Sequence, residues 1–233
     1  MTIRRRSGTS ASTAAPAPAK RRPIVMVSST VYGIEDLLDR IHTLLVNRGY
    51  TVWMSHAGTI RVNSQNHAFA DCLKAVEQCD LFLGLITTHY GSGQNPGDRT
   101  EPSITHQELL KAIELDKPRW FLAHSHVLFA RSFLRAMGKK AATDRAAITL
   151  KKGEAAIDDV RIVDMYEAVT EADPDFAKRR GNWVQKFRDE NDALTFVVSQ
   201  FPPQPEPFDR DSAAEALIAR VMTDVTTPSR STP

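Results

Sequence analysis

Val25-Met26-Val27-Ser28-Ser29-Thr30-Val31-Tyr32 begins as an apolar run and stops in hydroxyl-bearing residues. A run without alternating polar residues is typical of a central strand in a parallel sheet, because helices cover both of its faces. Two further apolar runs follow, at 81–86 and 118–123. Between the runs lie segments whose apolar residues recur at spacings of three and four, as in amphipathic helices. The chain therefore alternates strands and helices, which predicts an α/β fold with a parallel sheet.

These patterns give a full set of expected elements. We expect strands at 24–28, 51–54, 81–86, 118–123 and 160–166. We expect helices at 33–47, 66–78, 105–115, 127–137, 183–187 and 193–201, and a short amphipathic helix at 213–225. This set fits a flavodoxin-like, doubly wound parallel sheet of about five strands, with strand order 2-1-3-4-5 and helices on both faces.

Composition divides the 233 residues into four parts. Residues 1–22 carry six basic residues and no acid among Ser, Ala and Pro, so we expect a disordered basic tail. The whole chain has a net charge of only +2, so the remaining residues are acidic overall. We expect an α/β core at 23–138 and an extension at 139–203 that completes the domain. A Pro-rich, mostly disordered tail is expected at 204–233.

Several classes of protein do not fit the composition. No stretch is long and apolar enough to span a membrane, so we expect a cytoplasmic protein without a membrane partner. The basic tail suits nucleic acid or an anionic surface, or serves only solubility, and we otherwise expect no nucleic-acid partner. Cys72 and Cys79, seven residues apart, fit two reduced and buried thiols better than a redox pair or a zinc site. His124-Ser125-His126 lacks a third ligand, so we expect no metal.

Residues suited to ligand binding gather at one predicted edge of the sheet, where the carboxyl ends of parallel strands meet. Hydroxyls and N–H groups at a helix start suit phosphate or ribose, glycines permit close backbone approach, and aromatic rings stack on bases. The candidate ligand-binding residues are Ser28, Ser29, Thr30, Tyr32, Trp53, Tyr90, Gly91, Ser103 and His106. A simple turn at 28–30, a flexible surface loop at 90–93 and a core role for Trp53 are the alternative interpretations. The chain has no Gly-rich dinucleotide fingerprint, P-loop or serine-hydrolase elbow.

Glu108 is the candidate catalytic residue, and two interpretations of it compete. Thr105-x-x-Glu108 matches a capping box, in which the Glu side chain returns to the backbone N–H of the cap residue. Alternatively, Glu108 lies at the border of the buried helix face, because it stands one and two turns before Ala112 and Leu115. In that position its carboxylate faces the crevice. There it can hold ribose hydroxyls and stabilise positive charge at an anomeric carbon.

Four segments together resemble the family called domain of unknown function DUF4062. They are Ile24-Val-Met-Val-Ser-Ser-Thr-Val-Tyr, Cys72-Leu-Lys-Ala-Val-Glu-Gln-Cys-Asp-Leu-Phe-Leu-Gly, Tyr90-Gly91 and Ser103-Ile-Thr-His-Gln-Glu-Leu-Leu-Lys-Ala. The likeness covers residues 23–125, and the later Val163-Asp-Met-Tyr and Asn182-Trp-Val-Gln-Lys-Phe are similar to those of standalone members. Val31 and Gly33 depart from the Phe and Asp that the family often has.

The DUF4062 family resembles TIR domains and nucleoside deoxyribosyltransferases, which are flavodoxin-like folds with a glutamate early in the helix after the third strand. The resemblance implies that the 23–138 core is TIR-like and that Glu108 acts at the sugar of a nucleotide. It also implies self-association or partner-driven assembly, because TIR-like enzymes complete their sites in oligomers. Prokaryotic domains of this kind are often found in immune-type systems.

Three functions compete on this basis. The first is a TIR-like N-glycosidase, a hydrolase of the NAD glycohydrolase type, that cleaves NAD or a related nucleotide in an immune-type or stress response. The nucleotide is then the substrate, and we expect no separate cofactor. Its nicotinamide ring would stack near Tyr90 or Trp53, with the ribose at Glu108 and the phosphates at 28–30. The second is a non-catalytic TIR-like module for signalling, assembly or nucleotide sensing, and the third, weaker, is a nucleoside deoxyribosyltransferase.

Overall fold

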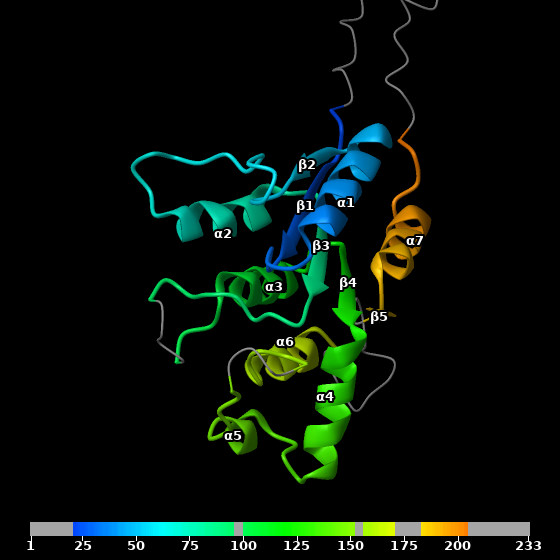
Figure 1. Ribbon diagram of the computed structural model, residues 1–233. Helices are drawn as coiled ribbons and strands as arrows, with labels where there is room; N and C mark the ends of the chain where they lie inside the picture. The colour runs from blue at the N-terminus through cyan, green and yellow to red at the C-terminus, as the bar shows by residue number, and fades with distance from the viewer. Residues whose placement is uncertain (1–20, 96–99, 152–155, 171–182, 205–233) are drawn as a thin grey trace, which may run out of the picture. The chain divides into compact units, whose positions relative to one another are not determined.

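The computed structural model describes residues 21–95, 100–151, 156–170 and 183–204. Within them, one parallel sheet has the strand order β2-β1-β3-β4-β5 (Figure 1). The strands are β1 (Ile24–Ser29), β2 (Thr51–Trp53), β3 (Leu81–Ile86), β4 (Arg119–His124) and β5 (Val184–Phe187). The predicted flavodoxin-like class and strand order are confirmed.

Helices cover both faces of this sheet. They are α1 (Glu35–Asn47), α2 (Ala68–Gln78), α3 (Ile104–Glu114), α4 (Ser125–Ala136), α5 (Ala142–Arg145), α6 (Arg161–Thr170) and α7 (Glu190–Gln200). Buried side chains of α1 and α7 pack in one apolar cluster with one face of the strands. Buried side chains of α2, α3, α4 and α6 pack in a second cluster with the other face. The arrangement is that of a doubly wound fold (Figure 1).

Strand alternation decides which side chains face which cluster. Along β1, Val25 and Val27 enter the cluster of α1 and α7, whereas Met26 enters the cluster of α2 and α3. Successive side chains of a strand point to opposite faces, so Ser28 shares the face of Met26. In the register of the sheet, Ser28 lies beside Gly84 of β3. Ser28, the first polar residue of β1, therefore lies on the α2 and α3 side of the sheet, near the carboxyl end of the strand.

Two expected elements after residue 138 are wrong. The segment 160–166, expected as a strand, lies in helix α6 from Arg161 onward, and the segment 183–187, expected as a helix, contains strand β5. In α6 the buried residues Ile162, Met165 and Val169 recur at spacings of three and four, which a short apolar run hides. The four residues of β5 become a strand by pairing with Phe121–His124 of β4, a contact that local sequence does not reveal.

Other expectations fall outside the described residues. These are the helix at 213–225, most of the basic tail at 1–22 and nearly all of the Pro-rich tail at 204–233. The fifth strand and the last described helix both lie in the 139–203 segment. In the described part of the chain, none of the helices combines the length and the apolar character needed to cross a membrane.

Candidate functional site

Two buried polar side chains meet at the carboxyl end of β1. Oγ of Ser28 donates a hydrogen bond to Oε2 of Glu108 at 2.5 Å. Glu108 lies in the second turn of α3, and only 5% of it is exposed, against 2% of Ser28. The strand supplies Ser28 by alternation, and the helix supplies Glu108 from its buried face together with Leu109 and Ala112. The predicted neighbourhood of the first loop and Glu108 is therefore a direct contact.

The capping interpretation of Glu108 is wrong. Ser103 is the N-cap of α3, and its side chain accepts a hydrogen bond from the backbone N–H of His106 at 3.3 Å. Glu108 is the fifth residue after this cap, two positions too deep for a capping box. Its carboxylate bonds to Ser28 of another element instead. Ser103 therefore caps the start of α3, and Glu108 takes no part in the capping.

Cys72 of α2 is a third member of this cluster, and sequence reasoning treated it only as an inert buried thiol. Its thiol lies close enough to the Glu108 carboxylate for each group to shift the pKa of the other. Burial raises the pKa of Glu108 to about 7, while the hydrogen bonds from Ser28 and Cys72 act to lower it. Burial and the nearby Glu108 carboxylate raise the pKa of Cys72 to about 12, so the group is a thiol donor at neutral pH. The expected inward face of the 66–78 helix was the only sequence signal for this contact.

A second polar cluster surrounds His106. The hydroxyl oxygen of Tyr90 lies 2.8 Å from Nδ1 of His106 and accepts from the backbone N–H of Ser103 at 3.3 Å. This arrangement favours donation from the Tyr90 hydroxyl to Nδ1, which leaves the imidazole proton on Nε2. Burial, with a contribution from the nearby Arg161 cation, lowers the pKa of His106 to about 4. His106 is therefore a neutral ring at pH 7.

The segment before and at the start of α6 completes the second cluster. The guanidinium of Arg161 lies over the Tyr90 ring, 4.3 Å from its centroid. Asp158 accepts from the backbone N–H of Tyr90 at 2.9 Å and pairs with Nδ1 of His89 at 3.1 Å. Tyr90, expected as a stacking platform for a base, is only 3% exposed and is tied into the protein on several sides. Sequence reasoning missed Arg161 and Asp158, because nothing local connects them to Tyr90.

The two clusters lie on different sides of α3. Glu108 contacts β1 and α2 through Ser28 and Cys72, whereas His106 contacts the loop after β3 and lies near Arg161 of α6. Two residues along a helix are separated by about 200° of rotation, so these side chains point apart. The sequence placed both in one crevice. The structure joins Glu108 with Ser28, and His106 with Tyr90 and Ser103, but not Glu108 with His106.

Thr30 and Gly91 close the space between the two loops. Gly91 has φ +79°, a conformation that side chains rarely adopt, and a Cβ there would lie 3.1 Å from Oγ1 of Thr30. The same Cβ would lie 3.9 Å from Cβ of Ser103. The glycine thus lets the loop after β3 approach both the first loop and the start of α3. Thr30, Gly91 and Ser103 are brought together as the edge argument predicts.

The remaining candidates lie around this centre. The side chain of Ser29 donates to the carbonyl of Thr30 at 3.0 Å. Tyr32 is 69% exposed, with its ring edge-on to His89 at 4.8 Å. Trp53 is buried in the core cluster on the α2 side, and it also lines a cavity of about 260 Å³ beside Arg61 and Lys74. Of the aromatic candidates, Tyr32 is the one that offers its ring to solvent.

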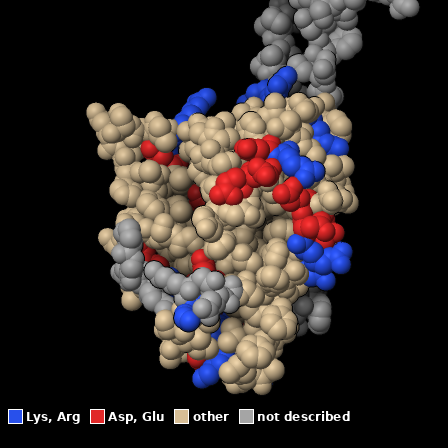
Figure 2. All heavy atoms as spheres, in the orientation of Figure 1, with Lys and Arg blue, Asp and Glu red and all other residues tan. Residues whose placement is uncertain are grey.

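The space-filling view shows how one face of the molecule is shaped and charged (Figure 2). The molecule is hollowed on the side that carries α2 and α3, whereas charged side chains of both signs interleave over α1 and α7 (Figure 2). The ion pair between Arg40 of α1 and Glu190 of α7 belongs to that second surface.

Comparison with known proteins places the chain in a family. The family model described as "Domain of unknown function (DUF4062)" matches residues 24–193. The chain belongs to the DUF4062 family. No curated protein matches this DUF4062 chain. Among solved structures it is similar to the TIR domains in "Structure of the activated Roq1 resistosome directly recognizing the pathogen effector XopQ", at 10% identity and a TM-score of 0.44. That likeness covers 76% of this chain and 98% of the other.

In this DUF4062 domain, the Glu108 carboxylate is placed where it can stabilise a nearby positive charge. Glu108 sits in a nearly water-free position, where a charge interacts more strongly than it would in water. Its pKa of about 7 means that both charge states are populated near neutral pH. The hydrogen bond from the Ser28 hydroxyl holds its orientation. His106 is a neutral donor on the other side of the helix and does not share a proton with Glu108.

Proposed function

We propose that this DUF4062 domain is a TIR-like nucleotide N-glycosidase that hydrolyses the bond between ribose and nicotinamide in NAD or a related nucleotide. Glu108 is the catalytic residue of the proposal. The observation that supports it is the buried Glu108 carboxyl, bonded to Ser28 at the carboxyl edge of the sheet and not engaged in capping α3. The family resemblance supports a setting in an immune-type or stress response, with the active form assembled from several copies.

In this reaction the main task of the protein is to stabilise the positive charge that forms on the ribose. The bond from C1′ to the nicotinamide nitrogen breaks, and the electron pair leaves with the ring, which departs neutral. Positive charge then develops on the ribose, and an adjacent carboxylate stabilises it. Water adds to C1′ and releases a proton. The ionised form of Glu108 is the one that works.

Burial of Glu108 suits this role. An isolated carboxylate in a dry site holds its proton, which is why the pKa of Glu108 rises to about 7. A substrate that brings the positive charge of the nicotinamide ring to within a few ångströms favours the ionised form. Substrate binding and ionisation of Glu108 therefore reinforce each other.

The test is incubation of the full chain with NAD, at low and high protein concentration, with nicotinamide release followed by chromatography. Glu108→Gln should abolish release, because it removes the charge and keeps the size of the side chain. Glu114→Gln is the matched control, since Glu114 lies on the same helix with its side chain 67% exposed. Equal release by wild type and Glu108→Gln would exclude Glu108 as the catalytic residue.

A non-catalytic nucleotide-sensing or assembly module is the second candidate. The observation that favours it is the 5% exposure of Glu108, which leaves little of the carboxyl open to a substrate. On this alternative, calorimetry detects NAD binding by wild type, and no condition yields nicotinamide. If the protein is instead a nucleoside deoxyribosyltransferase, cleavage of the nucleoside should depend on an added free base as acceptor.

A further inference from the structure

Helix α4 carries a row of large apolar side chains on its outer surface. Phe129, Phe133 and Met137, the last at the helix C-cap, are 65%, 55% and 58% exposed. They follow each other at intervals of four residues, so they form one ridge along the helix. The rings of Phe129 and Phe133 are stacked, with centroids 6.1 Å apart and 13° between their planes. Val127 and Leu134 already anchor α4 to the core, so the ridge is not needed for that packing.

The chain segment that carries this ridge is predominantly basic. Residues 125–151 contain six basic residues and a single acid, Asp144. The carboxylate of Asp144 accepts from the backbone N–H of Ala141, at the start of α5. No carboxylate of the described residues pairs with Lys139 or Lys140, which follow α4 directly. The ridge is therefore bordered by cations at the C-terminal end of the helix.

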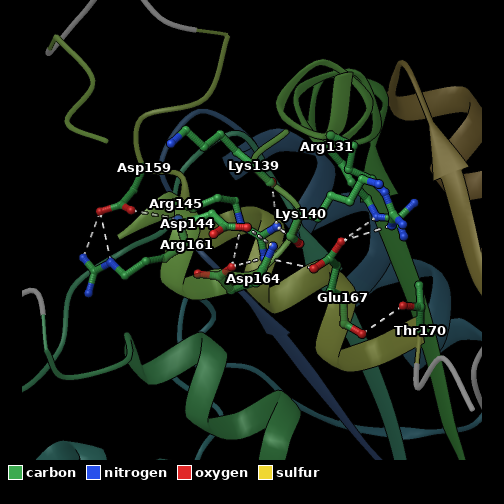
Figure 3. A network of polar contacts seen from close by, with 12 residues as sticks. Arg131, Lys139, Lys140, Asp144, Arg145, Asp159, Arg161, Asp164, Glu167 and Thr170 are labelled. Carbon is green, nitrogen blue, oxygen red and sulfur yellow. Dashed lines mark hydrogen bonds and ion pairs between the residues drawn. The ribbon is translucent and has the colours of Figure 1, made fainter. Parts of the chain in front are cut away.

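The acids of α6 do not neutralise this region. Arg131 and Arg135 of α4 both pair with Glu167, at 3.1 and 3.5 Å. Arg145 pairs with Glu167 and with Asp164 as well (Figure 3). Three guanidinium groups thus share two carboxylates. A cationic excess remains beside the apolar ridge.

This charge pattern selects among possible occupants. A second copy could pair its α4 antiparallel with this one, centred on Phe133. That arrangement would set Arg131 of each copy opposite Arg135 of the other, with no acid on either helix. Like charges placed directly opposite are unfavourable. A helix that lies on a membrane buries a broad apolar face. The ridge here is a single row of three side chains, which fits the groove between the ridges of one partner helix.

We propose that α4 is a docking surface for an acidic amphipathic helix of a partner protein. Apolar side chains of that helix, spaced by four residues, would pack against Phe129, Phe133 and Met137. Its flanking carboxylates would face Lys139 and Lys140. They would also face Arg131 and Arg135, which share the single carboxylate of Glu167. This inference does not depend on catalysis at Glu108, because it concerns another surface and another readout.

The test uses two labelled helical peptides of identical Leu spacing at i, i+4 and i+8, one flanked by Glu and the other by Lys. The Glu peptide should bind the full chain, and the binding should weaken with added salt. Phe129→Ser combined with Phe133→Ser should reduce its affinity by roughly tenfold or more. Val62→Ser is the matched control, since Val62 is a 74% exposed apolar residue outside α4.

Lys139→Glu combined with Lys140→Glu should weaken binding of the Glu-flanked peptide and strengthen binding of the Lys-flanked peptide. The proposal is overturned if neither peptide binds, if both bind equally, or if Val62→Ser matters as much as the Phe variants. Binding to phosphatidylserine vesicles but not to the Glu peptide would make the ridge a membrane contact. A dimer in sedimentation that the Phe variants abolish would make it a contact between copies.

Discussion

Glu108 is the residue on which the candidate site depends, and its surroundings set its charge. Desolvation holds its pKa near 7, while Ser28 and Cys72 favour the anion. The unfolded chain loses the same proton near pH 4.5, so between these values the folded state binds more protons. Glu108 therefore costs stability as pH rises through this window, up to about 3 kcal/mol. A buried group that costs stability when charged is typical of a functional position.

The first prediction follows from this pH dependence. Glu108→Gln should raise the melting temperature at pH 8 and have a much smaller effect at pH 4.5, where Glu108 is protonated in the folded state and about half protonated in the unfolded state. Thermal unfolding in matched buffers checks this. Glu114→Gln, on the exposed part of the same helix, should show no such pH dependence. A uniform loss of stability at both pH values would mean that the buried carboxyl is neutral or favourably bonded throughout.

A second prediction concerns how the rate of nicotinamide release depends on pH. If the ionised carboxylate performs catalysis, nicotinamide release should rise as pH increases from 6 to 8, because the proton leaves near pH 7. Ser28→Ala removes one donor to the anion, so the rise should move to higher pH. Cys72→Ala should move it in the same direction. A pH profile that is unchanged in both variants would separate the rate from the charge of Glu108.

Tyr90 and His106 give a third prediction at this scale. Tyr90→Phe leaves both the Ser103 N–H and His106 Nδ1 without their partner, which should cost about 1–3 kcal/mol of stability. Nitrogen NMR of wild type should show a neutral His106 with its proton on Nε2, and Tyr90→Phe should loosen that preference. A charged His106 at pH 6 in wild type would contradict the geometry.

At the scale of elements, short α5 is held by one buried residue. Arg145 is 1% exposed, donates to the carbonyl of Lys140 at 2.7 Å and pairs with Asp164 and Glu167 of α6 (Figure 3). Arg145→Met should cost about 3–5 kcal/mol, because it leaves the carboxylates of α6 without their main cation. Arg188→Met is the control, since that Arg is 70% exposed beside Asp192 and should cost about 1 kcal/mol or less. Chemical denaturation of both variants measures the difference.

The elements also show what sequence patterns can and cannot predict. The strands and helices up to residue 136 were found to within about two residues, because long apolar runs and helical spacing are local signals. Strand β5 was missed because its four residues are defined by pairing with β4. The partnership of Ser28 and Glu108 followed from the sheet edge, whereas the contacts of Cys72, Arg161 and Asp158 depend on how helices pack and leave no local trace.

At the scale of the whole molecule, the segment 139–203 is part of the fold rather than an appendage. Phe187, Val197 and Phe201 are buried in the cluster that covers one face of the sheet. A chain ending at residue 138 should therefore fail to fold cooperatively, whereas one spanning 21–204 should melt in a single transition. Circular dichroism on heating checks both. Cooperative unfolding of the shorter chain would mean that the first four strands suffice.

The late position of β5 in the chain has a consequence during protein synthesis. Its partner among the described strands, β4, is complete about sixty residues earlier, and a ribosome adds roughly 5–20 residues per second. For several seconds the nascent chain must carry β4 as an unpaired edge, the kind of edge that recruits strands from neighbouring chains. We therefore expect that slowing translation after codon 124 lowers the soluble yield without changing the finished protein.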